Sequence, residues 1–305
     1  MSKRKIYFIG LLANVDSSIL NVKLDYDFKI STREDFTLFS ILEGLSKRQI
    51  ISKFLKFHCL SDKRLYYVSN SFESDIEIDN DGILIYLPPE WIEFNNNCDL
   101  GYLDPVIRLM RLFKEGNICI PLKYYYFFTD NNIPKLLSRM ESISNISSEA
   151  YRLEDSEIPD LQEFIQKMKL PFKESFLQLA FENFESSYQA TNINLSFLSL
   201  MISLETLFNP GEELRYRVSR NTAVLLGKDK GDSERIFSEI KDLYDKRSKI
   251  VHTGVSNIIE EDLLKLRYYV RESIKEINEI GKNKDELLGF LNSCGFGERP
   301  RKNRE

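Results

Sequence analysis

An arginine and a histidine lie five positions apart near the end of a segment with helical periodicity, a combination suited to chemistry on phosphate groups. The guanidinium of Arg247 stays charged and offers a planar fork of donors that matches phosphate oxygens. His252, one of only two histidines in the chain, can accept or donate a proton near neutral pH, because the unperturbed pKa of histidine is about 6.5. Gly254 predicts the end of the helix just after this pair.

Arg247 occupies a position where the helical pattern predicts a hydrophobic residue. Ile236, Ile240 and Leu243 precede it, and Ile250 follows it, at the spacing of a single helix face. A guanidinium on an apolar face is costly unless it is paired or faces a cleft or an interface. We therefore predict that Arg247 either binds an acidic residue or lies at a functional surface.

His252 lies on a different face, about 140° around the helix from Arg247, and shares that face with Ser248 and Asp245. A purely structural interpretation is also open. In it, Arg247 pairs with an acid of the core, and His252 caps the helix end, where an imidazolium suits the negative end of the helix dipole. Spacing alone does not decide between the two interpretations.

The chain has 305 residues, enough for two domains, and its 42% hydrophobic and 29% charged residues are typical of a protein with a substantial core. A net charge of −5 gives no global attraction to nucleic acid, so any such contact needs local basic patches. The four cysteines lack the spacing of metal ligands or of a disulfide framework, so we expect no metal, no cofactor and a reducing, cytoplasmic setting. No segment approaches the ~20 apolar residues of a membrane span, and we expect no membrane partner.

The first residues imitate a secretion signal, with a basic stretch followed by apolar residues. The apolar run is short, contains Tyr7 and Gly10, and continues into strand-like sequence. We therefore predict that Lys5–Leu12 is the first strand of a folded domain.

Residues 1–130 mix the periodicities of strands and helices, which predicts an α+β domain that contains a sheet. His58 and Cys59 lie in an apolar run and are more typical of a buried core than of a nucleophile pair. Residues 131–160 are polar and are predicted to be a connector, in which Lys135–Met140 has helical character. The predicted elements are strands at Lys5–Leu12, Leu20–Ile30, Leu65–Ser69, Gly82–Leu87 and Ile118–Phe128, and helices at Phe36–Leu45 and Pro105–Lys114.

Residues 161–285 carry helical periodicity almost throughout, which predicts an antiparallel bundle of four to five helices and makes the whole chain α+β. Residues 286–305 are predicted to be a basic tail. Its last part, Arg299–Glu305, lacks apolar residues and could touch phosphates, but such a short charged terminus is more typical of a solvated end. The predicted helices are Phe172–Thr191, Leu195–Phe208, Leu214–Leu226, Asp232–His252 and Glu260–Ile280.

The segment Leu195–Phe208 is apolar nearly all round and is therefore the predicted central helix, although it contains Glu205. The helix that carries Arg247 is predicted to start at Asp232 or Ser233 as its N-cap. The predicted core of the bundle contains Leu198, Met201, Leu204 and Leu207.

Three blocks of sequence, Phe197–Phe208, Arg217–Arg220 and Leu243–Gly254, occur in the order found in the HEPN superfamily. Over roughly residues 165–285 the chain resembles the Apea-like branch of that superfamily, from prokaryotic defence systems. The resemblance implies a five-helix bundle that dimerises through the helix carrying the Arg–His motif. Many members are metal-independent endoribonucleases, and others bind RNA or act as scaffolds without catalysis, so the fold alone does not establish activity.

The resemblance also assigns roles to residues. Arg247 and His252 match the paired catalytic residues, and Glu205 matches an acidic residue of the second helix. Ser248 stands where many related toxins carry Asn, Asp or His. Thr253 follows the histidine where toxins paired with a nucleotidyltransferase carry a modifiable tyrosine, which argues against control by adenylylation.

The expected activity is cleavage of RNA through attack by its own 2′-OH, which needs a base, an acid and positive charge on the phosphorane. The helical half contains one histidine, so a homodimer would supply His252 and Arg247 from both chains to one cleft. Ser248 would orient the imidazole, and Glu205 would hold the fork of Arg247. The expected phosphate-binding residues are Lys246, Lys249, Arg217 and Arg220.

Two other interpretations stay open beside a defence or toxin ribonuclease. Arg247 and His252 could contact RNA or a nucleotide without cutting it, in a binding or sensor module. Alternatively, Arg247 and Glu205 could form a purely structural pair that requires neither RNA nor a dimer. Residues 1–130 match no family by their motifs, and we expect them to recognise an unidentified partner or trigger.

Overall fold

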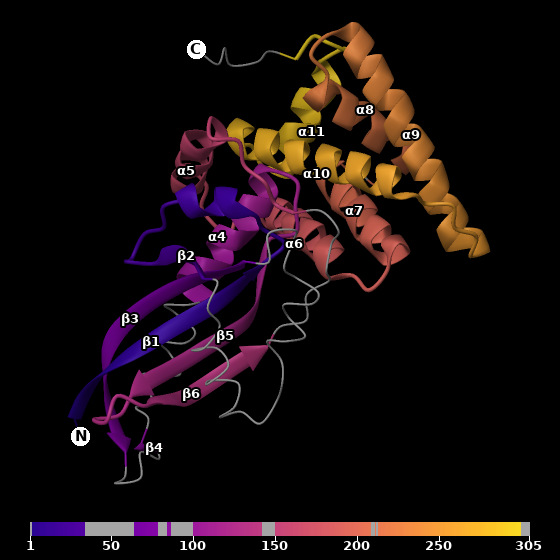
Figure 1. Cartoon of the computed structure of the whole chain (residues 1–305). Helices are drawn as coiled ribbons and strands as arrows, with labels where there is room; N and C mark the ends of the chain where they lie inside the picture. The colour runs from indigo at the N-terminus through magenta and orange to yellow at the C-terminus, as the bar shows by residue number, and fades with distance from the viewer. Residues whose placement is uncertain are drawn as a thin grey trace. The chain divides into compact units, whose positions relative to one another are not determined.

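The computed structural model describes residues 2–33, 64–78, 84–86, 100–141, 150–208, 211 and 213–299. The chain divides into two compact units, Met1–Met168 and Lys169–Glu305 (Figure 1). The first contains an antiparallel sheet and the second contains helices, so the chain is α+β. The predicted helix Phe36–Leu45, the His58–Cys59 pair and the end of the basic tail lie outside the described residues.

The sheet of the first unit has the strand order β2-β3-β1-β5-β6, with β4 paired to β3. The first strand, which pairs with both β3 and β5, is central, and this confirms a strand at Lys5–Leu12. All pairs are antiparallel. The strands are β1 (Ser2–Ala13), β2 (Lys29–Arg33), β3 (Leu65–Ile78), β4 (Leu84–Tyr86), β5 (Cys119–Phe128) and β6 (Pro134–Glu141).

Alternation along the strands gives the sheet two apolar faces. On one face, Ile6 and Phe8 pack with residues of α4 (Leu100–Phe113) and α5 (Glu157–Lys167). On the other face, Ile9 and its neighbours form a separate buried cluster with Tyr124 and Tyr126 of β5. Burial on both sides explains why β5 is apolar almost without interruption.

The prediction of a strand over Leu20–Ile30 is wrong for most of its length. Ser17–Asn21 forms a short 3-10 helix, η1, whose start is capped by the side chain of Asp16. Tyr26 and Asp27 then adopt left-handed backbone angles, with φ of 55° and 61°. Because a strand needs extended backbone, pairing with β3 begins only at Lys29.

The expected connector at residues 131–160 contains structure that belongs to the first unit. Lys135–Met140 is not helical, because these residues lie in β6 and pair with β5, with Arg139 opposite Tyr124. Tyr151 is fully buried and forms an isolated parallel bridge with Val15. The first unit continues through α5 to Met168.

Six helices make up the described part of the second unit, which confirms an all-helical second half with one helix more than expected. Met201, Leu204 and Leu207 of the central helix are fully buried as predicted, whereas Leu198 is only half-buried. The helices are α6 (Ser175–Gln189), α7 (Ile193–Phe208), α8 (Leu214–Leu226), α9 (Lys230–Thr253), α10 (Glu260–Ile280) and α11 (Lys284–Ser293).

The helix that carries the Arg–His motif, α9, begins two residues earlier than predicted. Asp229 is its N-cap, and its carboxylate accepts a hydrogen bond of 2.8 Å from the backbone N–H of Asp232. Asp232 and Ser233 therefore lie inside the first turn. The predicted terminator is confirmed, because Gly254 has a φ of 68°, which favours glycine.

The prediction of a tail that begins at residue 286 is wrong up to residue 299, and Arg299, the first residue of the expected solvated end, is buried. Leu287 and Leu291, spaced one helical turn apart in α11, are fully buried. The guanidinium of Arg220 on α8 donates to the carbonyl oxygens of Leu291 and Cys294, at 3.1 and 2.8 Å. Arg299 is buried and donates to Glu276 at 2.6 Å. This segment is thus part of the helical core.

Candidate functional site

The arginine on the apolar stripe of α9 is paired with the acid of the central helix. A guanidinium nitrogen of Arg247 lies 3.3 Å from Oε1 of Glu205, and the two side chains are 24% and 15% exposed. That oxygen has no partner with hydrogen-bond geometry among the described residues, so the contact is an ion pair and not a bidentate fork. Arg247 therefore keeps donors that can bind another anion.

Tyr244 completes this cluster, and sequence analysis missed it. The centre of its ring lies 5.7 Å from the guanidinium carbon of Arg247. Burial raises the pKa of Tyr244, and the charge of Glu205 and a hydrogen bond to that carboxylate raise it further, while Arg247 opposes the shift. The signal was present in the sequence, because Tyr244 and Arg247 are three residues apart on one helix face.

His252 lies in the last turn of α9 and is exposed. Within the described residues, neither His252 nor Ser248 has a side-chain hydrogen bond or ion pair, so the predicted orienting bond between them is not formed in the single chain. The structure therefore brings Arg247 and Glu205 together and leaves the histidine open to solvent.

The four basic residues expected to bind phosphate differ in their surroundings. Lys246 donates to both carboxylate oxygens of Asp262 on α10, each at 2.6 Å. Arg217 lies 3.7 Å from Glu213, one turn away on α8. Lys249 is exposed and has no ion pair within the part of the chain that the structure describes.

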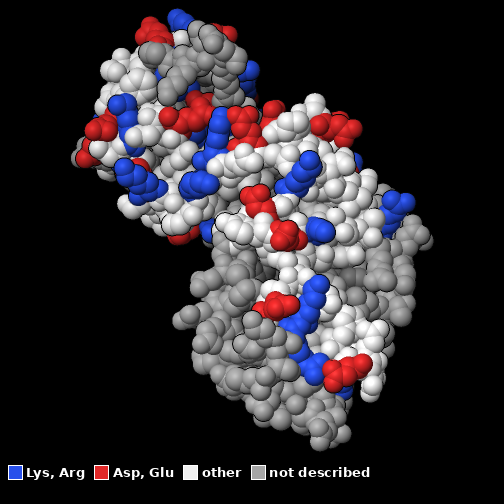
Figure 2. Space-filling model, turned by 90° about the vertical axis from the view of Figure 1, so that its left-hand side faces the viewer, with Lys and Arg blue, Asp and Glu red and all other residues white. Residues whose placement is uncertain are grey.

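Arg220, the fourth basic residue, has a structural task. Its fork donates to the end of α11, as described above, and it is only partly exposed. On the face in Figure 2, Lys and Arg side chains are interspersed with Asp and Glu, without a large patch of one sign on its coloured part. Contact with an RNA strand would therefore depend on a few local side chains, as the net charge of −5 predicts.

Large apolar side chains are exposed beside the Arg247–Glu205 pair, toward the start of α7 and the end of α9. On α7, Ile202 precedes Glu205 by three residues, and on α9, Val251 follows Arg247 by four, so each shares a helix face with its neighbour. Ser256, in the turn after α9, bonds Asn194 of α7 at 2.5 Å. The exposed side chains are Leu195, Ile202, Val251, Val255 and Ile259, each between 45% and 61% accessible, and we call them the apolar rim.

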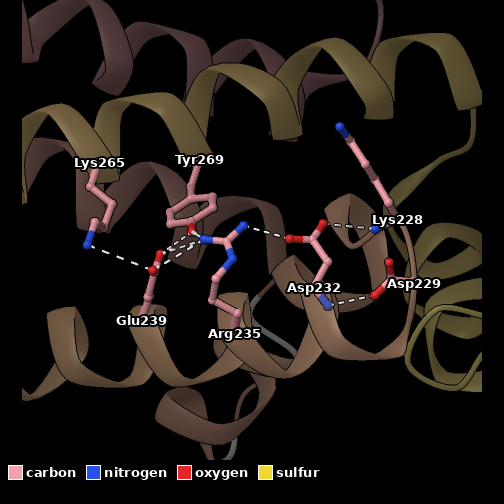
Figure 3. A network of polar contacts seen from close by, with 7 residues as sticks. All are labelled: Lys228, Asp229, Asp232, Arg235, Glu239, Lys265 and Tyr269. Atoms are coloured by element: carbon pink, nitrogen blue, oxygen red, sulfur yellow. Dashed lines mark hydrogen bonds and ion pairs between the residues drawn. The ribbon is translucent and has the colours of Figure 1, made fainter.

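A network of polar contacts fastens the first half of α9 to α10 (Figure 3). The guanidinium of Arg235 donates to Asp232 at 2.6 Å and to both oxygens of Glu239 at 3.2 Å. The Tyr269 hydroxyl of α10 donates to Glu239 and accepts from Arg235 at 3.2 Å. Burial raises the pKa of Tyr269, and Glu239 adds to the shift, so the phenol stays protonated. The network therefore holds the first half of α9, the helix that carries Arg247, against α10.

Replacing Asp232 tests how much this carboxylate contributes to the stability of the fold. The backbone N–H of Lys228 and then the guanidinium of Arg235 hold the pKa of Asp232 below its usual range. A depressed pKa stabilises the folded state above the unfolded pKa of about 3.9, and this contribution is lost as the pH falls through the folded value. We expect Asp232→Asn to lower the free energy of unfolding by about 1 kcal/mol at pH 7, and the deficit to shrink below about pH 4. Urea unfolding at both pH values measures it.

Asp242→Asn is the matched control, because Asp242 is exposed on the same helix and has no ion pair within the described residues. It should unfold like the wild type at both pH values. A deficit for Asp232→Asn that grows in acid would contradict the assigned direction of the pKa shift.

Within the described residues, no group of three or more His, Cys, Asp or Glu side chains is placed to hold a metal ion. The described cysteines, Cys119 and Cys294, are buried. None of the described helices has both the length and the apolar character of a membrane span.

Comparisons with protein-family models, with curated proteins and with solved structures found no match to this chain.

Proposed function

We propose that the helical unit is a HEPN-type, metal-independent endoribonuclease of the Apea-like kind, acting in the cytoplasm as a defence or toxin effector. The observation that carries the proposal is the contact of Arg247 with Glu205, because it joins two of the three sequence blocks on which the resemblance rests. All three blocks fall on consecutive helices, α7, α8 and α9, of one compact unit. Stability alone is a weak reason to retain an ion pair beside the core.

The apolar rim supports a homodimer through α9. Large apolar side chains exposed together on a surface are typical of an interaction site, and here Ile202 and Val251 share helix faces with Glu205 and Arg247. A two-fold axis beside Val251 would cover the rim and bring the exposed His252 of one chain toward that of its partner. The dimer would thereby supply two histidines for proton transfer, whereas one chain supplies only one.

The proposed reaction is a transesterification at one phosphodiester bond of the RNA. The 2′-OH attacks the adjacent phosphorus, the bond to the 5′-oxygen breaks, and a 2′,3′-cyclic phosphate and a 5′-OH form. One His252 removes the proton of the 2′-OH, and the protonated His252 of the other chain protonates the leaving oxygen. The guanidinium of Arg247 stabilises the charge on the non-bridging oxygens, and Glu205 holds it in place.

Other residues take supporting roles in this proposal. Ser248 positions the imidazole once the dimer has formed, and Lys249 and Arg217 contact the phosphates of the strand. Lys246 joins them when its ammonium group exchanges Asp262 for a phosphate. We leave Arg220 out of the RNA-binding surface, because its guanidinium is occupied by the carbonyl oxygens at the end of α11.

Cleavage of RNA in the presence of a chelator tests the proposal most directly. Because the substrate supplies the nucleophile and His252 moves the protons, no metal-bound water is needed. The purified chain should therefore cut single-stranded RNA at the same rate in excess EDTA. End-group analysis should find 2′,3′-cyclic phosphate and 5′-OH termini.

Two results would contradict this assignment. Loss of cleavage in EDTA, or products with 3′-OH ends, would exclude the metal-free mechanism assigned to Arg247 and His252. Light scattering that shows a monomer with undiminished cleavage would exclude the shared cleft.

A binding or sensor module is the second candidate, and one observation favours it. Within the described residues, His252 has no hydrogen bond that fixes its imidazole, as an acid–base group usually requires. This alternative predicts that wild type and His252→Ala both bind RNA and that neither cuts it.

A further inference from the structure

The face of the sheet opposite α4 and α5 carries a hollow of about 460 Å³. A volume of this order is usual for sites that bind small molecules, which range from about 300 to 1,000 Å³. The hollow lies in the first unit, on strands that contribute nothing to the site described above. Its lining includes Tyr7, Tyr67, Tyr126, Lys29, Asp27 and Asn70.

The strand register explains why these side chains meet. Tyr7 of β1 is paired with Ser71 on one side and with Tyr126 on the other. Directly paired residues project from the same face, so a row of side chains crosses β3, β1 and β5. Lys29 is paired with Ser69 at the point where β2 begins, and it therefore borders the same hollow.

Aromatic rings form a platform in this hollow. The rings of Tyr7 and Tyr126 are stacked, with centres 5.3 Å apart and planes 21° apart. The ring of Phe128 lies nearly perpendicular to both of them. The ammonium group of Lys5 lies 5.5 Å from the centre of the Tyr7 ring, so a cation borders the platform. Stacked tyrosines beside a lysine suit a flat aromatic ring that is linked to a negatively charged group.

The polar groups of the hollow point to the same ligand. Lys29 and Asp27 are exposed, and neither has an ion pair within the described part of the chain. Asn70 is already fixed, because its amide donates to the carbonyl oxygen of Tyr26 at 3.0 Å and its Oδ1 accepts from Ser71 N–H at 2.6 Å. Lys29 can bind a phosphate, and the carboxylate of Asp27 can accept from an amino or hydroxyl group.

We propose that this hollow binds a nucleotide, with its base on the half-buried ring of Tyr7, which stacks on the buried ring of Tyr126, and its phosphate on Lys29. Base stacking on aromatic side chains is tolerant of sequence, and the lysines add attraction for the backbone. The ligand is either a free mononucleotide or one residue of a single-stranded RNA. Binding here does not depend on cleavage at Arg247 and His252.

Fluorescence titration of the full-length chain tests the proposal with four probes: adenosine 5′-monophosphate, adenosine, ribose 5-phosphate and a labelled five-nucleotide RNA. We expect Tyr7→Leu to weaken binding of the monophosphate by about 5- to 100-fold, the usual effect of losing one stacking partner. Tyr7→Phe keeps the ring and should bind like the wild type. Lys29→Gln should weaken the monophosphate by about 2- to 5-fold and leave adenosine unchanged.

Lys23→Gln is the matched control, because Lys23 is exposed in the same unit and does not line the hollow. Circular dichroism of each variant separates a binding defect from unfolding. If the monophosphate binds as tightly as the RNA, the ligand is a free nucleotide, and if the RNA binds far more tightly, it is a strand. Absence of binding for every probe at millimolar concentration overturns the proposal. Wild-type affinity in folded Tyr7→Leu and Lys29→Gln overturns it as well.

Discussion

His252→Ala should cut RNA about 10²–10⁴ times more slowly than the wild type, which is the usual contribution of general acid–base catalysis. The loss is expected to be large because a two-fold dimer would lose its base and its acid through one substitution. His252 is exposed and has no ion pair within the described residues, so its removal should leave the fold intact. Single-turnover cleavage of a labelled RNA measures the rate, and thermal unfolding measures the fold.

The control for this substitution is Asp242→Asn, which changes an exposed side chain of the same helix and should cut RNA at the wild-type rate. Equal cleavage by His252→Ala and the wild type would remove histidine from the mechanism. Binding of RNA by both, with cleavage by neither, would favour the sensor module.

Arg247→Lys should reduce cleavage by about 10²–10³, the usual effect of losing one donor that stabilises a transition-state charge. Lysine keeps the positive charge beside Glu205 but lacks the planar fork that matches phosphate oxygens. The melting temperature should stay close to that of the wild type, because the ion pair with Glu205 can still form. Cleavage rates and thermal unfolding of the same preparation separate catalysis from stability.

A purely structural role for Arg247 predicts a different pattern. Arg247→Ala would then destabilise the bundle strongly, because the half-buried carboxylate of Glu205 would lose its partner. Arg247→Lys would behave like the wild type in every assay. Glu205→Gln separates the two roles further, since it removes the charge that needs a partner and should rescue the stability of Arg247→Ala if that role is correct.

The helices whose bounds were predicted most accurately are those that residues of their own segment define. The bounds of α8 and α10 agree with the predictions at Leu214–Leu226 and Glu260–Ile280, because apolar spacing and a following glycine define a helix within its own segment. The strand β6 was missed because its pairing with β5 is a tertiary contact and its own sequence, with Leu136 next to Leu137, lacks a clear alternation of apolar and polar residues. Tyr26 and Asp27 ended a predicted strand through backbone angles that their residue types do not require.

The candidate site was predictable to a similar extent. The position of Arg247 on an apolar stripe required a partner, and Glu205 was the acid on the central helix, so the contact could be predicted. The task of Arg220 could not, because it depends on carbonyl oxygens some 70 residues later in the chain, at Leu291 and Cys294. The sequence around Arg220 does not distinguish an arginine that is available to bind phosphate from one that holds another helix in place.

The position of α11 determines where the chain can be truncated without disrupting the core of the helical unit. A fragment that ends after Gly281 would keep every residue of the Arg–His motif, yet it would uncover the core positions that Leu287 and Leu291 fill. It would also deprive Arg220 and Glu276 of the groups that they bind. Purification tags and fusion partners are therefore best placed beyond residue 299, and an inactive shorter fragment would report on folding, not on chemistry.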